Sequence, residues 1–219
     1  MNTPIESVKN YVLLGPPGSG KSTQATKLKE KLHLAHVDVG SELRSLAESE
    51  TELGKRIHEV INVKKELVSD GLIGCVVEHV LKGIKSDTGV LVDGAPRRIS
   101  QVDEVEQALA LHERKIAKVI FLDLSLEEAV KRISIRFLCL KCKKPFIKQE
   151  VMSLICDQCG GEIGQRQDDT PDGVAKRYEV FMAETRPVIE YFEEQRMLLR
   201  IDARMLPDEI FEILMKKLA

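Results

Sequence analysis

The segment 15–22, Gly-Pro-Pro-Gly-Ser-Gly-Lys-Ser, matches the pattern G-x-x-x-x-G-K-[ST] at every position. An apolar, β-prone segment at 11–14 precedes it, and a helical stretch at about 22–32 follows it. Glycines let the backbone turn tightly, so that consecutive N–H groups can point inward at phosphate oxygens. The pattern therefore predicts a nucleotide phosphate loop between a strand and a helix. The residues expected to contact a nucleoside triphosphate are Gly15, Gly18, Ser19, Gly20, Lys21, Ser22 and Thr23, with Lys21 on the β- and γ-phosphates and Ser22 beside Mg²⁺.

Strand-like and helical segments alternate along the rest of the chain. Strands are expected at 11–14, 34–37, 90–92, 118–122 and 197–201, and further helices at 41–53, 71–84, 101–112, 126–136 and from about 173. Strands that alternate with helices form a parallel sheet covered on both faces. The predicted fold class is α/β, with a five-stranded parallel sheet wrapped by helices around a P-loop core.

Composition excludes several classes of protein. The 219 residues are 43% hydrophobic and 31% charged, which excludes wholesale disorder and allows a sizeable core. No apolar run approaches the length of a membrane span, and the first ten residues lack a secretory pattern. With 33 Lys and Arg against 35 Asp and Glu, a general nucleic-acid coat is not expected. We expect a cytoplasmic protein.

A carboxylate at the end of the third expected strand is a candidate for holding Mg²⁺. Asp93 closes the apolar segment 90–92, and the carboxyl ends of parallel strands share the edge at which the phosphate loop lies. There Asp93 can hold the ion through water. The alternative is an Asp that only caps a turn.

Four of the five cysteines form two closely spaced pairs. Cys-x₂-Cys, thirteen residues and a second Cys-x₂-Cys can place four thiolates tetrahedrally around Zn²⁺, which would make a closed, structural site. A disulfide is the weaker alternative in a reducing compartment, and Cys75 is expected to be a small core residue. The segment 131–166 also carries eight basic and three acidic residues, an excess of five that indicates either a solvated face or a surface closing over a polyanion. The expected metal ligands are Cys139, Cys142, Cys156 and Cys159.

Three motifs together resemble the adenylate kinase family. They are GPPGSGKSTQ at 15–24, DGAPR at 93–97 and RQDD at 166–169, in the order and at the intervals of the long bacterial form whose lid binds a metal. The resemblance covers essentially the whole chain. It implies Mg²⁺-dependent transfer between ATP and AMP to give two ADP, in a monomer. It also implies a core at 1–37, 69–134 and 171–219, a monophosphate-binding segment at 38–68 and a zinc-bearing lid at 135–170.

The same resemblance assigns roles to individual residues. Planar guanidinium groups suit the clamping of two polyphosphates, because they bind phosphate bidentately and stay protonated. By resemblance, Arg44 and Arg97 hold the monophosphate, Arg132 and Arg136 face the triphosphate, and Arg166 and Arg177 bridge the two. Asp168 and Asp169 would orient lid arginines, and Gln101 would read the edge of the acceptor base. The acceptor set is Val39, Gly40, Arg44, Val68, Gly94, Arg97, Gln101, Arg166 and Arg177; the catalytic set is Lys21, Arg97, Arg132, Arg136, Arg166 and Arg177.

Departures from the family pattern leave alternatives open. Val39 and Ser41 stand where the family usually has Thr and Asp, Ala95 where it has Phe, and Ser22 where it has Gly. A kinase for UMP or CMP is therefore one alternative. A nucleic-acid-binding ATPase with a zinc ribbon is another, although the insert 139–164 offers only Phe146 for base stacking.

Overall fold

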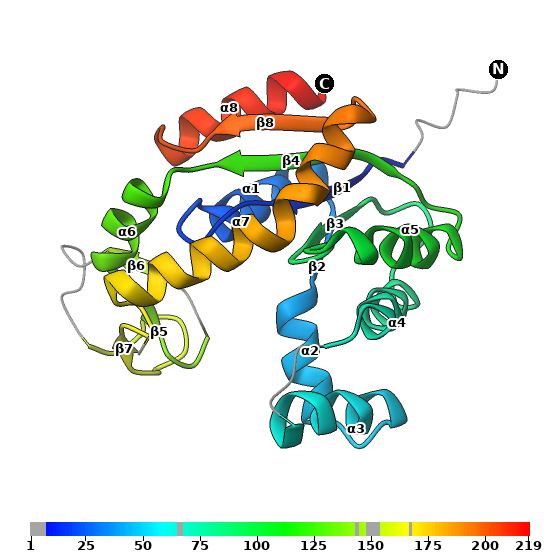
Figure 1. Ribbon diagram of the computed structural model, residues 1–219, viewed down its shortest axis with the longest axis horizontal. Coiled ribbons are helices and arrows are strands. Elements are labelled where there is room, and N and C mark those ends of the chain that lie inside the picture. Colours follow the sequence, from blue (N-terminus) through cyan, green and yellow to red (C-terminus); the bar gives the residue numbers. More distant parts are fainter. Residues whose placement is uncertain (1–7, 65–67, 143–144, 148–153, 167) are drawn as a thin grey trace.

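A computed structural model describes residues 8–64, 68–142, 145–147, 154–166 and 168–219. Its centre is a five-stranded sheet in the order β2-β3-β1-β4-β8, in which every pair of neighbouring strands is parallel (Figure 1). The predicted α/β class is confirmed, and all five expected strands are present. They are β1 (Asn10–Leu14), β2 (Ala35–Asp38), β3 (Val90–Asp93), β4 (Ile116–Asp123) and β8 (Leu198–Asp202).

Helices cover both faces of this sheet, as alternating apolar side chains on the central strand require. Val12 and Leu14 of β1 face one core cluster, and Tyr11 and Leu13 face the other. The first cluster is completed by α4 (Asp70–Leu81), α5 (Val102–Ala110) and α7 (Pro171–Glu194). The second is completed by α1 (Lys21–Leu32), α6 (Leu126–Ser134) and α8 (Pro207–Leu218).

The expected helix at 41–53 is wrong in its extent. The structure has α2 (Val39–Ala47) and α3 (Glu52–His58), separated by a turn. Thr51 caps α3 by accepting a hydrogen bond from the N–H of Gly54 at 3.0 Å. A Cβ on Gly54 would lie 2.4 Å from the carbonyl oxygen of Leu46, so the turn brings the two helices into close backbone contact. A π-helical turn, η1 (Glu59–Lys64), extends α3.

The helix α8 was not anticipated, although the sequence carries a signal for it. Pro207 occupies its first turn, and Ile210, Leu214 and Leu218 recur at a spacing of four on its buried face. The helix expected to reach residue 136 ends instead at Ser134, and the next strand begins at Arg136.

A small antiparallel sheet lies beyond α6, apart from the main sheet (Figure 1). It has the strand order β6-β5-β7, formed by β5 (Arg136–Cys139), β6 (Pro145–Ile147) and β7 (Ile163–Gly164). Its own core consists of Cys139, Cys156 and Ile163. This module matches the inserted segment that interrupts the βα alternation. Among the described residues, no helix combines the length and apolar character needed to cross a membrane.

Candidate functional site

The phosphate loop turns sharply between β1 and α1. Gly18 and Gly20 have φ values of 79° and 86°, in the left-handed region that favours glycine. A Cβ on Gly15 would lie 2.5 Å from Oγ of Ser19 and 3.0 Å from the carbonyl oxygen of Leu122. The side chain of Ser19 is buried, and its Oγ has no hydrogen-bond partner among the described residues. Ser22 and Thr23 follow in the first turn of α1, so the predicted phosphate-binding residues lie in the loop and at the N-terminus of this helix.

Lys21 lies across this loop. Its Nζ donates hydrogen bonds to the carbonyl oxygens of Gly15, at 2.5 Å, and Pro16, at 3.4 Å. Burial lowers the pKa of Lys21, and Asp93 opposes that effect while Arg97 and Arg136 add to it. Charged groups from β3, from the loop after it and from β5 therefore act on one ammonium group. The fold brings together residues that lie up to 115 positions apart in the chain.

Two carboxylates end adjacent strands at this edge. Asp38 of β2 pairs in register with Asp93 of β3, and both act on Lys21 electrostatically. Asp38 also caps α2, because its Oδ1 accepts from the N–H of Ser41 at 2.9 Å. Asp93 was predicted from the sequence, whereas Asp38 was not. The same signal, a carboxylate that ends an apolar strand, could have found it.

Each of the two arginines that are expected to hold the monophosphate lies next to a glycine. A Cβ on Gly40 would lie 3.6 Å from Nη1 of Arg44, and a Cβ on Gly94 would lie 3.6 Å from Nη2 of Arg97. The same Cβ on Gly94 would lie 3.7 Å from the backbone N of Gly40, so the two glycines are themselves neighbours. Both guanidinium groups are on exposed side chains. Val39, in contrast, is buried in the main core.

Gln101 is buried and hydrogen-bonded on both sides of its amide. Its Oε1 accepts from the backbone N–H of Arg97 at 2.8 Å, and its Nε2 donates to Oδ1 of Asp70 at 2.9 Å. The carbonyl of Val68 accepts a hydrogen bond from Arg98 at 3.0 Å. The acceptor residues Val68 and Gln101 are thus linked to Arg98 and Asp70, neither of which was predicted from the sequence.

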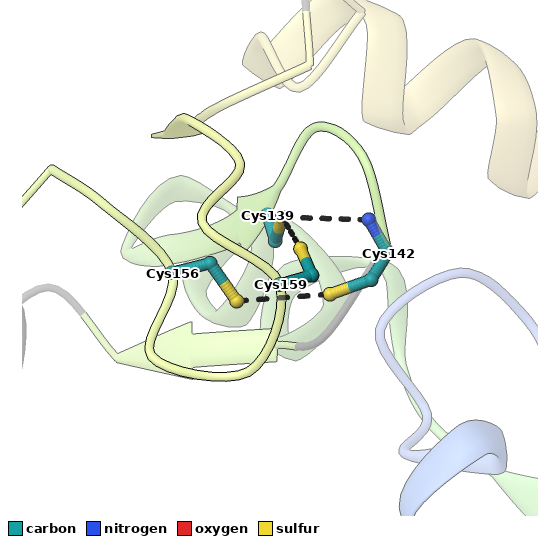
Figure 2. A group of neighbouring side chains, drawn as sticks. All are labelled: Cys139, Cys142, Cys156 and Cys159. Carbon is teal, nitrogen blue, oxygen red and sulfur yellow. Dashed lines mark hydrogen bonds between the residues drawn. The ribbon is translucent and has the colours of Figure 1, made fainter.

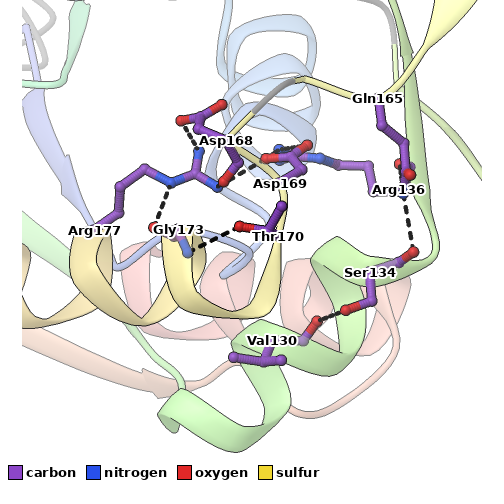
Figure 3. A network of polar contacts seen from close by, with 9 residues as sticks. All are labelled: Val130, Ser134, Arg136, Gln165, Asp168, Asp169, Thr170, Gly173 and Arg177. Carbon is purple, nitrogen blue, oxygen red and sulfur yellow. Dashed lines mark hydrogen bonds and ion pairs between the residues drawn. The ribbon is translucent and has the colours of Figure 1, made fainter.

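A buried carboxylate joins two of the remaining arginines (Figure 3). Nη2 of Arg136 lies 2.9 and 3.0 Å from the two oxygens of Asp169, and Nη2 of Arg177 lies 2.8 Å from one of them. Arg177 also pairs with Asp168 at 3.0 Å. Burial raises the pKa of Asp169, but the hydrogen bonds from the two arginines outweigh it and hold the pKa below its usual value.

The other two arginines occupy different surroundings. The side chain of Arg166 is exposed in part, but its partial burial lowers its pKa, and the charge of Arg136 lowers it further. Arg132 is held by Glu128, at 2.9 Å, and by the carbonyl oxygen of Arg204, at 3.1 Å. Five of the six predicted catalytic residues, Lys21, Arg97, Arg136, Arg166 and Arg177, thus act electrostatically on one another or on a shared neighbour.

The four paired cysteines converge within the small sheet (Figure 2). All four Sγ atoms lie within 4.8 Å of one another, with Cys139 and Cys159 at 3.4 Å and Cys142 and Cys156 at 3.7 Å. Four thiolates about 2.3 Å from one Zn²⁺ would be about 3.8 Å apart, so the cluster has suitable dimensions for zinc. Burial raises the pKa of the Cys139 thiol, but hydrogen bonds from its neighbours, led by the N–H of Cys142, lower it to about 6. Cys75, expected in the core, is half-buried on α4.

The basic excess of the insert is only partly described. Lys131, Lys141 and Arg166 lie on exposed side chains, whereas Lys143, Lys144 and Lys148 lie outside the described residues. The interpretation as a surface that closes over a polyanion therefore stays a prediction.

Comparison with known proteins agrees with the site. The adenylate kinase family model matches residues 13–197. An adenylate kinase of Fervidobacterium nodosum is 36% identical over 211 residues, which cover 94% of this chain and 95% of the relative. That of Kosmotoga olearia is 37% identical over 212 residues, covering 95% and 98%, and that of Alkaliphilus oremlandii is 36% identical over 203 residues, covering 91% and 94%. These matches confirm the resemblance inferred from the three motifs: the chain belongs to the adenylate kinase family.

Proposed function

We propose that the chain catalyses ATP + AMP ⇌ 2 ADP at the carboxyl edge of the five-stranded sheet. One observation carries the assignment: Lys21 of the phosphate loop lies within electrostatic reach of Asp93 and Arg97, which belong to the segment 93–97, and of Arg136 from a distant one. Phosphoryl transfer between two nucleotides needs this kind of convergence, because charge on the transferred group must be neutralised from several sides. No side chain need act as a covalent nucleophile.

The two nucleotides are proposed to occupy opposite sides of this convergence. The donor ATP would lie on the phosphate loop, with Lys21 on its β- and γ-phosphates and Arg132 and Arg136 beside its triphosphate. The acceptor AMP would lie against Gly40, Arg44, Gly94 and Arg97, where two guanidinium groups border adjacent glycines. Arg166 and Arg177 would bridge the two nucleotides, and Gln101 would contact the base of AMP.

Two metal ions are part of the proposal. Ser22 and Asp93 would hold Mg²⁺, which neutralises phosphate charge when ATP is bound. Cys139, Cys142, Cys156 and Cys159 would hold one structural Zn²⁺, because a closed set of four thiolates leaves no ligand position for substrate.

The remaining expectations concern organisation. We propose that 38–68 and 135–170 move relative to the core and close over bound nucleotides, since closure would exclude water from a poised phosphoryl group. We further propose that the enzyme acts as a monomer in the cytoplasm and binds neither nucleic acid nor membrane. A reducing compartment would keep the four thiols available to zinc.

The test is a set of initial rates with ATP–Mg²⁺ and each of AMP, UMP, CMP and GMP. We expect AMP to have the highest kcat/KM of the four acceptors. A higher value with UMP or CMP would make the chain a kinase for that nucleotide. Nucleotide hydrolysis stimulated by single-stranded DNA, without phosphoryl transfer to any monophosphate, would favour the ATPase alternative.

A further inference from the structure

The carboxylate of Asp70 gathers three side chains at the start of α4. Its Oδ2 accepts from Oγ of Ser100 at 2.7 Å, and its Oδ1 accepts from Nε2 of Gln101 at 2.9 Å and pairs with Nη2 of Arg98 at 2.8 Å. Burial raises the pKa of Asp70, but these partners outweigh it and hold the pKa below its usual value. At neutral pH this group is therefore ionised and can only accept hydrogen bonds.

The amide of Gln101 is consequently held in one orientation. On one side the backbone N–H of Arg97 can only donate, and it does so to Oε1; on the other side Asp70 can only accept, and it does so from Nε2. A rotation of the amide by 180° would place NH₂ against N–H and carbonyl oxygen against carboxylate. Both hydrogen bonds would be replaced by repulsive contacts. Water could not relieve this repulsion, because Gln101 is only 4% exposed.

Arg98 holds Asp70 in place from the outside. Besides its ion pair with Asp70, its Nη2 donates to the carbonyl oxygen of Val68 at 3.0 Å, and its Nε lies 3.8 Å from Oε2 of Glu184 on α7. The guanidinium group thus links the end of the proposed monophosphate segment, the start of α4 and the long helix α7. Movement of Asp70 away from Gln101 would require breaking these contacts.

A locked amide still has hydrogen-bonding capacity to spare. A glutamine amide offers two N–H donors and two oxygen lone pairs. One donor is engaged by Asp70 and one lone pair by Arg97, so one of each remains. Adenine matches such a pair, because it presents the donor N6–H₂ beside a ring-nitrogen acceptor. Hypoxanthine has the acceptor O6 in the place of N6, so it needs the opposite orientation of the amide.

We propose that Asp70, held by Arg98, is a positioning residue that locks the Gln101 amide so that the acceptor site selects a 6-amino purine over a 6-oxo purine. The inference rests on the proposed contact between Gln101 and the base of AMP. A freely rotating amide could serve either base, whereas the locked amide faces O6 with its own oxygen. Hypoxanthine mismatches the locked amide twice, at O6 and at N1–H. Since one neutral hydrogen bond changes binding by about five- to tenfold, the locked site should disfavour IMP by a factor on the order of 10².

The experiment compares AMP with IMP, two acceptors with the same ribose phosphate. Asp70→Ala removes the acceptor that Nε2 of Gln101 meets, whereas Asp70→Asn would keep an oxygen there, because the same Oδ1 also accepts from Arg98. We expect Asp70→Ala to raise the ratio of kcat/KM for IMP to that for AMP by about tenfold, with the KM for ATP changed less than twofold. Arg98→Gln, which retains Asp70 but loosens it, should raise the ratio by a smaller factor.

The control is Glu78→Gln, which removes a carboxylate on the same helix that pairs with Lys82 at 2.9 Å, away from Gln101. It should leave the ratio of kcat/KM for IMP to that for AMP unchanged. An equal loss of activity with both nucleotides in Asp70→Ala and Arg98→Gln, or no change in either variant, would refute the proposed lock, because a merely structural role does not alter the ratio of the two kcat/KM values.

A third variant separates this inference from the proposed function. Gln101→Ala should lower kcat/KM for AMP, and the kcat/KM values for AMP and IMP should become more similar. If Gln101→Ala leaves AMP kinetics unchanged, the proposed base contact itself is wrong, and the lock with it. If Gln101→Ala impairs AMP while Asp70→Ala leaves the ratio unaltered, the base contact stands and only the lock is refuted.

Discussion

Replacing Asp169 by Asn tests how the arginines near the phosphate loop are held. The Asp169 carboxylate is fully buried, and it accepts from Arg136 at 2.9 and 3.0 Å and from Arg177 at 2.8 Å. Asparagine retains one acceptor oxygen but turns an NH₂ group toward guanidinium donors. The change therefore removes the only carboxylate that both arginines contact among the residues that the structure describes.

The magnitude follows from burial and from the number of contacts. A hydrogen bond to a charged group is worth about 1.5–3 kcal/mol, and breaking a buried ion pair costs about 3–5 kcal/mol. The arginine side chains are 28% and 27% exposed, so they can regain hydration in the variant. We expect a loss of about 2–3 kcal/mol in the free energy of unfolding, which for a chain of this size corresponds to a Tm lower by about 5–10 °C. Turnover should fall by about 10²-fold, because small displacements of charge-neutralising groups are costly.

The pH dependence of this contribution has a definite sign. The pKa of Asp169 is lowered in the folded protein, so its contribution is complete at pH values above the unfolded pKa of about 3.9 and is lost as the pH falls through the folded pKa. Urea unfolding at pH 7, 4 and 3 should therefore show the difference between wild type and Asp169→Asn shrinking at the lowest pH.

The matched control is Asp168→Asn. Asp168 is 56% exposed and pairs with Arg177 at 3.0 Å, so its loss should cost less than about 1 kcal/mol. Kinetics and thermal unfolding would be measured side by side for the two variants. If Asp169→Asn keeps wild-type turnover and Tm, or if the two substitutions have equal effects, then the buried carboxylate does not hold the two arginines as inferred.

Three other outcomes are expected. Lys21→Met should reduce turnover by about 10³-fold or more in a coupled ADP assay, because the charge acts on phosphate. The Tm should fall only slightly, through the lost hydrogen bonds to Gly15 and Pro16. More than a tenth of wild-type turnover would exclude that role. Gly15→Ala should weaken ATP binding measured by calorimetry, since its Cβ would lie 2.5 Å from Oγ of Ser19, and unaltered affinity would contradict the tight loop. Elemental analysis should find about one zinc per chain, and Cys156→Ser should lose it. This variant should be cleaved faster by proteases around 140–160, and its turnover should fall more than its affinity for ATP. Native protein without metal and with four freely titrating thiols would contradict the zinc site.

Local features of the chain were predictable from the sequence. The phosphate loop depends on glycines at fixed positions between a strand and a helix, and the φ values of Gly18 and Gly20 agree with that reading. The two Cys-x₂-Cys pairs likewise predict two short turns that together hold a metal, and the structure places all four Sγ atoms within 4.8 Å of one another. Such features are decided by neighbours in the chain, so their residue types and spacing suffice to predict them.

The rest depended on contacts between distant segments. Periodicity at 41–53 could not show that the chain turns between Ala47 and Thr51, because that turn is stabilised by packing of α2 against α3. Asp38 joins Asp93 only through the register of β2 on β3. The lock on Gln101 requires Asp70, 31 positions earlier, to be carried beside it by the packing of α4 on η2 (Ile99–Gln101) and α5. Sequence alone gives each of these side chains a polar character; the tertiary structure decides which acceptor each donor meets, because strand register and helix packing set distances that no local pattern records.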